Sequence, residues 1–162
     1  MDRTSQGSLW RVWDFHCHTP ASYQWKGSPI LRGTTGEARE QIVAQTVTAL
    51  EAAEPDVFVI MDYWTFDGYL AIAAYLREYP ESLAGKRVFP GIELRVESSL
   101  AKRLNVHLII DPTADPQLLQ DVLNELKLSL RSGERGISEA CFIQYARDLG
   151  DDKLSAAGFM PA

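Results

Sequence analysis

Two of the three histidines in this 162-residue chain lie one residue apart, in "DFHCHTPAS", residues 14–22. They end an apolar run, "LWRVWDF", that is typical of a β-strand. Because side chains alternate along a strand, His16 and His18 are expected on one face and Cys17 on the other. Two imidazoles on one face are suitable ligands for Zn²⁺, Mn²⁺ or Fe²⁺. The simpler alternative is a pair of polar residues at the end of a strand.

Acidic groups and the third histidine accompany the other apolar runs. Asp62 ends "DVFVIMD", Glu93 follows Pro-Gly in "KRVFPGIEL", and His107 lies in "LNVHLIID", which Asp111 ends. In parallel α/β folds, reactive groups gather at the carboxyl ends of the strands. Taken singly, Asp62 is typical of a turn or cap, Glu93 of a surface and His107 of a hydrogen-bonded strand. Four separate strands that each supply such a group favour a metal site.

Strand and helix patterns alternate along the chain, in the order β-α-β-α-β-β-α-α. This order predicts one α/β domain over residues 1–162, with a parallel sheet or a (β/α) barrel. Four strands are too few to close an eight-stranded barrel, so we expect an open sheet or the first half of a larger structure. The expected helices span 34–54, 68–79, 115–130 and 138–149. Thr34 and Glu37 are expected to form a capping box for the first helix, and Asp67 to cap the second. Pro90–Gly91 is expected to interrupt the third strand.

Composition narrows the functional class. The net charge is −6, which argues against a stand-alone nucleic-acid binder, although bound metal ions can supply positive charge locally. No apolar run is long enough for a membrane span, and the polar start "MDRTSQGS" lacks the apolar core of a signal peptide, so we expect a cytoplasmic protein. The two cysteines are expected to be reduced thiols.

Four motifs, in order, give a family resemblance. "DFHCHTPAS" resembles the first motif of the PHP (polymerase and histidinol phosphatase) superfamily, and "VIMDYWTFDGY", "FPGIELRVE" and "LNVHLII" are similar to the next three, over residues 9–111. The resemblance implies a distorted (β/α) barrel, of which this chain would hold the first four strands with their covering helices. It also implies hydrolysis of phosphate esters or nucleic-acid phosphodiesters by metal-activated water.

The resemblance also implies roles for individual residues. The metal ligands would be His16, His18, Glu93 and His107, holding Zn, Mn or Fe. Asp62 and Asp14 would assist catalysis, Asp62 as a further ligand or by orienting a water, and Asp14 by steadying an imidazole.

Two departures from the family pattern limit the expected activity. Tyr63 stands where the second motif usually has a histidine ligand, and no histidine follows His107, so a full trinuclear cluster is not expected. The alternative to an enzyme is a degenerate, non-catalytic module that acts through partners. An amidohydrolase also begins with H-x-H after its first strand, but P-G-I-E favours the PHP superfamily.

One subgroup is more similar than the superfamily as a whole. "DYWTFDGY" resembles the PHP-like domains at the N-terminus of long AAA/SMC-like ATPases of the TrlF type. This resemblance implies that the chain is the N-terminal part of a longer protein, or that it associates with an ATPase. The chain itself has no G-x-x-x-x-G-K-[ST] motif. A half barrel would leave a sheet edge open, so we also expect a homo-oligomer or another partner.

Overall fold

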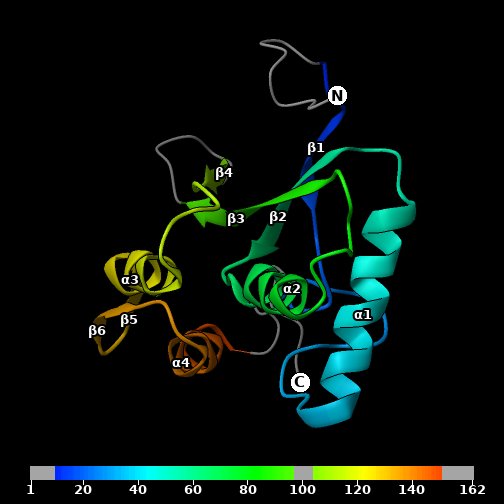
Figure 1. Ribbon diagram of the computed structural model, residues 1–162. Coiled ribbons are helices and arrows are strands. Elements are labelled where there is room, and N and C mark those ends of the chain that lie inside the picture. The colour runs from blue at the N-terminus through cyan, green and yellow to red at the C-terminus, as the bar shows by residue number, and fades with distance from the viewer. Residues whose placement is uncertain (1–9, 97–103, 151–162) are drawn as a thin grey trace.

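The computed structural model describes residues 10–96 and 104–150. Its centre is a curled sheet of four strands in the order β1-β2-β3-β4, which forms half a barrel (Figure 1). The fold is therefore mixed α/β, as the sequence predicts. The strands of this sheet are β1 (Trp13–Cys17), β2 (Val57–Tyr63), β3 (Arg87–Val96) and β4 (Leu104–Ile109).

Four helices lie within the described residues, with a small hairpin between the last two. Helices α1 and α2 lie side by side against the sheet, whereas α3, the hairpin and α4 form a group at one end (Figure 1). None of the helices in these ranges is both long and apolar enough to cross a membrane. The elements are α1 (Gly36–Ala52), α2 (Asp67–Glu78), α3 (Pro116–Glu125), β5 (Lys127–Leu130), β6 (Gly133–Gly136) and α4 (Glu139–Leu149).

Strand β2 is the centre of the core. It pairs in parallel with β1 on one side and β3 on the other, and all of its residues are buried. This explains its nearly continuous apolar sequence, because a strand covered on both faces cannot alternate with polar residues. Its Phe58 and Ile60 belong to the core cluster together with Val43 and Val47 of α1.

The expectation of an all-parallel sheet is wrong for the last strand, because β4 runs antiparallel to β3. The physical reason is the length of the connection. Only residues 97–103 separate the two strands, and a parallel crossover needs a dozen or more residues. Pro90–Gly91 also does not interrupt β3, because Pro90 and Gly91 keep their register with Ile60 and Met61.

The helix starts differ in detail from the expected caps. The hydroxyl of Thr34 donates to the carbonyl of Ile30, and α1 begins after Thr35, so the predicted capping box is wrong. Asp67 is the first residue of α2 and not its cap, which is Phe66. The expected caps of the last two helices are confirmed, since Asp115 accepts from the amide of Gln117 and Ser138 from that of Cys141.

The predicted helix over 115–130 is too long, because a β-hairpin replaces its last turn. Strands β5 and β6 pair antiparallel, and Gly133 adopts a left-handed φ of 112° at the turn. The hairpin leads back to α3, where the amide of Ile137 donates to the carbonyls of Leu123 and Leu126, both at 3.1 Å. These bonds satisfy carbonyls that the end of α3 leaves open.

Lys86 connects the end of α1 to the start of β3. Its ammonium group donates to the carbonyls of Leu50 and Ala53, at the C-terminus of α1, and lies 5.5 Å from the ring centre of Phe58. A cation placed there satisfies open carbonyls and interacts favourably with the helix dipole.

We therefore expect Lys86→Met, which keeps the apolar stem, to lower the free energy of unfolding by about 1–2 kcal/mol. Urea unfolding measures the loss. Lys127→Met is the matched control, because Lys127 is exposed and, within residues 10–96 and 104–150, bonds only the carbonyl of Asn124. Its loss should be smaller, about 0.5 kcal/mol. Equal losses in the two variants would contradict this interpretation.

Candidate metal centre

A buried carboxylate lies at the centre of the site. The side chain of Glu93 in β3 is 0% exposed, and its Oε1 accepts hydrogen bonds from the Tyr63 hydroxyl at 2.7 Å and from Asn105 Nδ2 at 2.5 Å. Among the described residues, no lysine or arginine nitrogen lies within 4.0 Å of either oxygen. A buried carboxylate without a cation is costly, so this arrangement calls for a positive partner.

Three imidazoles surround this carboxylate. The Nε2 atoms of His16 and His18 lie 3.2 and 3.5 Å from Glu93 Oε2, and His107 Nε2 lies 3.8 Å from Oε1. Oε2 itself is buried and accepts no hydrogen bond within the described part of the chain. The structure thus brings together all three histidines and the glutamate of the third strand.

These distances fit a shared cation. The Nε2 atoms of His16 and His18 are 3.0 Å apart, so the two nitrogens and Glu93 Oε2 form a compact triangle. Two ligands of one tetrahedral Zn²⁺, each about 2.0–2.1 Å from the ion, are separated by about 3.3 Å. Nitrogen lone pairs that face a carboxylate oxygen repel it unless a proton or a metal ion lies between them. The donor set therefore fits a divalent metal.

The end of β1 is shaped to present both histidines. Its register with β2 steps from Asp14–Phe58 to Cys17–Ile60, so one extra residue forms a bulge around His16. Asp14 Oδ1 accepts from the backbone amide of His16 at 2.9 Å, so it holds the backbone of His16 and not the imidazole ring.

The antiparallel pairing of β4 sets the position of the third imidazole. His107 is the direct partner of Glu93 in the ladder, and directly paired residues point to the same face. Its ring centre lies 4.8 Å from that of His16. On the other side, the ring of His18 stacks on Tyr63, with centres 5.1 Å apart. Tyr63 therefore supports both a ligand ring and the carboxylate.

The pKa of His18 is shifted in the direction that favours metal binding. Burial lowers the pKa of His18 most, and the neighbouring His16 and, to a lesser extent, His107 also lower it, whereas Glu93 and a backbone contact with Met61 raise it. A neutral imidazole is the ligand form, so this shift favours coordination at neutral pH. Burial, with Asp14 and Asp62 nearby, raises the pKa of the Cys17 thiol to about 12, so this thiol stays protonated and is a poor ligand.

Two carboxylates singled out in the sequence do not join the cluster. Asp62 is 0% exposed and accepts hydrogen bonds from Thr19, on the amide and on the hydroxyl. Asp111 accepts from the amide and hydroxyl of Thr113 in an exposed turn after β4. Asp62 therefore binds the loop after β1, and Asp111 stabilises its own turn.

Sequence reasoning missed the polar residues that complete the surroundings of Glu93. Asn105 lies two residues before His107, so strand alternation could have placed it on the same face. The guanidinium of Arg95 lies 5.1 Å from the ring centre of Tyr63, and its Nη2 lies 3.0 Å from Gln24 Oε1. Gln24 comes from the long loop after β1, and no pattern in the sequence indicates that this loop reaches β3.

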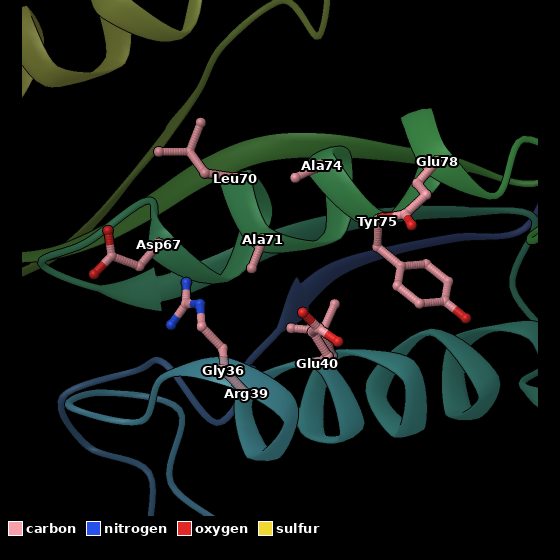
Figure 2. A pocket seen from close by; sticks show the side chains of 10 residues that line it. Gly36, Arg39, Glu40, Asp67, Leu70, Ala71, Ala74, Tyr75 and Glu78 are labelled. Carbon is pink, nitrogen blue, oxygen red and sulfur yellow. The ribbon is translucent and has the colours of Figure 1, made fainter.

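A separate groove of about 500 Å³ lies between α1 and α2 (Figure 2). Its walls carry Arg39 and Glu40 from α1 and Asp67, Tyr75 and Glu78 from α2, over the small side chains of α2. None of the histidines lines this groove, and neither does Glu93. The candidate metal centre is therefore distinct from this groove.

Asp62 should make folding depend on pH. Burial raises its pKa to about 7, against the hydrogen bonds from Thr19, which lower it. Between about pH 4 and pH 7 the folded protein holds a proton that the unfolded chain has lost, so this group's contribution to stability falls as the pH rises through that window.

We expect Asp62→Asn, which does not ionise in this range, to remove that dependence. The free energy of unfolding of the wild type, relative to the variant, should fall by on the order of 4 kcal/mol from pH 4 to pH 7. Urea unfolding of both proteins across this range measures the difference, in which the titration of all other groups cancels. A difference that is constant with pH would refute the expectation.

Comparisons with known proteins do not place the chain in a family. No family model matches it, and neither does any curated protein. The geometry of the cluster is therefore the basis for assigning a function.

Proposed function

We propose that the protein binds a divalent metal ion through His16, His18 and Glu93, with His107 as a fourth ligand, and hydrolyses phosphate esters or nucleic-acid phosphodiesters. The observation that supports this most is the buried Oε2 of Glu93, which has two imidazole nitrogens within 3.5 Å and no hydrogen-bond partner among the described residues. The PHP-like motifs of the sequence, with the barrel that they imply, support the same proposal.

The donor set favours particular ions. Imidazole nitrogens with one carboxylate suit Zn²⁺, Mn²⁺ or Fe²⁺, whereas Mg²⁺ and Ca²⁺ prefer oxygen ligands alone. Four ligands are enough for one ion, which agrees with the absence from this sequence of the later histidines that other PHP-like proteins use.

The protein's own residues would prepare the site in two ways, and a bound ion would supply the rest of the chemistry. Tyr63 and Asn105 donate to Oε1 of Glu93 and so leave Oε2 directed toward the histidines. The His16 side chain is 48% exposed, so water and a substrate can approach from the imidazole side while Glu93 stays closed to solvent. A bound divalent ion would lower the pKa of a coordinated water and neutralise phosphoryl oxygens.

The second candidate function is a metal-holding module that does not catalyse and that acts beside an ATPase. The position of Tyr63 favours this alternative. The family resemblance implies a histidine ligand at this sequence position. The Tyr63 hydroxyl instead donates a hydrogen bond to Glu93 Oε1, so a second ion would lack a ligand there. The proposal and the alternative share the metal and differ only in hydrolysis.

The test is metal content with activity. We expect purified protein to carry about one Zn, Mn or Fe per chain, and His16→Ala/His18→Ala to lose it while staying folded. Hydrolysis of bis-p-nitrophenyl phosphate or single-stranded DNA in added Mn²⁺ should disappear in the same variant. Asp111→Asn is the control, because it alters a carboxylate outside the cluster and should retain both properties.

Each outcome separates the candidates. Bound metal without hydrolysis would support the module, and folded protein that binds no metal would exclude both candidates. Metal that survives the double substitution would show that other residues hold it.

We also propose that the open sheet edges pair with a second copy or with another partner. The edge strands expose large apolar side chains, and an uncovered edge strand is a template for pairing. The exposed apolar residues of these strands are Trp13 and Phe15 in β1 and Leu104, Val106 and Ile109 in β4.

We expect light scattering after size-exclusion chromatography to give a mass above that of one chain. Val106→Lys places a charge on the edge of β4 and should shift the protein toward the monomer. A wild-type protein that stays monomeric at high concentration, with no partner bound, would refute the proposal.

A further inference from the structure

The loop that follows the two histidines is attached to the end of β2 at two consecutive residues. Asp62 Oδ1 accepts from the amide of Thr19 at 2.7 Å, and Oδ2 accepts from its hydroxyl at 2.6 Å. The amide of the next residue, Tyr63, donates to Ser22 Oγ at 3.1 Å. All of these side chains are buried, and Thr19 directly follows His18.

With Asp62 ionised, the direction of each hydrogen bond is defined. Thr19 Oγ1 also accepts from the amide of Ala21 at 3.1 Å, so its single proton is available for Asp62. Asp62 thus holds one residue by both its backbone and its side chain, which fixes the orientation of that residue. We call this pair the Asp62–Thr19 clamp.

The backbone of α2 packs closely against the clamp at Gly68. A Cβ atom at Gly68, in the first turn of α2, would lie 2.2 Å from Asp62 Oδ2 and 2.2 Å from Thr19 Oγ1. Trp64, two residues after Asp62, has a φ of 64°, a left-handed conformation that is strained for a bulky side chain. Such a conformation persists only where the surrounding contacts impose it, so β2, its turn and α2 form a rigid support.

We propose that Asp62 and Thr19 are positioning residues, which fix the direction in which His18 presents Nε2 to Glu93 and to the metal. The inference rests on the proposed metal site. It goes beyond that site because Asp62 would act by holding Thr19 in place and not by contacting the substrate. Loss of the clamp would remove the attachment of Thr19 to β2, and the Nε2 atom of His18 would then leave its 3.5 Å contact with Glu93. Residues that orient metal ligands commonly change affinity by 10–100-fold.

The test compares Thr19→Val, which removes the hydroxyl at similar volume, with Thr19→Ser, which keeps it. Affinity for Co²⁺ is measured by competition with a chromophoric chelator, and the visible spectrum of the Co²⁺ form reports the ligand geometry. We expect Thr19→Val to weaken binding by about 10–100-fold and to alter the spectrum. Thr19→Ser should bind within about threefold of the wild type. Thr19→Ala replaces the valine variant if that one does not fold.

Thr65→Val is the matched control. Thr65 is also buried, and its hydroxyl also accepts from a backbone amide, that of Asp67, in a contact that involves no histidine. It should lower the unfolding midpoint of the metal-free protein without changing Co²⁺ affinity or spectrum.

The outcomes separate this inference from the proposed function. A Thr19→Val protein that binds Co²⁺ like the wild type would overturn the clamp and leave the metal site standing. An equal loss of affinity in Thr65→Val would show a general effect of stability and would also overturn it. A folded wild type that binds no Co²⁺ would overturn both.

Discussion

The structure of this protein depends on how one buried negative charge is accommodated. Glu93 is 0% exposed in the middle of a sheet, where an uncompensated carboxylate would cost several kcal/mol. Two neutral donors satisfy one of its oxygens, and imidazole nitrogens face the other. The half barrel, the bulge in β1 and the antiparallel β4 all serve to bring those groups to the same point. A cation in this place would join the stability of the fold to its chemistry.

The two faces of the sheet have different roles. On the helix side, Phe58 and Ile60 pack in the core, and Asp62 binds the loop after His18. On the concave side, Tyr63 and Glu93 reach toward the imidazoles. Because side chains alternate along β2, Asp62, which holds the loop, and Tyr63, which contacts Glu93, are consecutive residues on opposite faces. A change in the core next to Asp62 would be transmitted to the site over a very short distance.

The sequence indicated the residues of the candidate site better than the strand directions and contacts that bring them together. The apolar runs indicate the strands, and the H-x-H spacing, Glu93 and His107 are visible because few residue types bind metals. The antiparallel direction of β4 follows from the short connection between β3 and β4, whereas the order of the motifs alone indicates a parallel strand. The hairpin of β5 and β6 was missed because Leu126 and Leu130 continue the helical spacing of Leu119 and Leu123. The contact between Asp62 and Thr19 joins residues 43 positions apart, and no local pattern encodes it.

The antiparallel placement of β4 has a kinetic consequence. β4 is an edge strand whose residues are mostly exposed, so it is held by one ladder only and opens at a lower free energy than β2. His107 leaves the site whenever β4 detaches, whereas His18 and Glu93 stay attached to the core. In the proposed metal site, the rate at which a metal ion exchanges with solvent would therefore be set by the fraying of β4 and not by the unfolding of the protein.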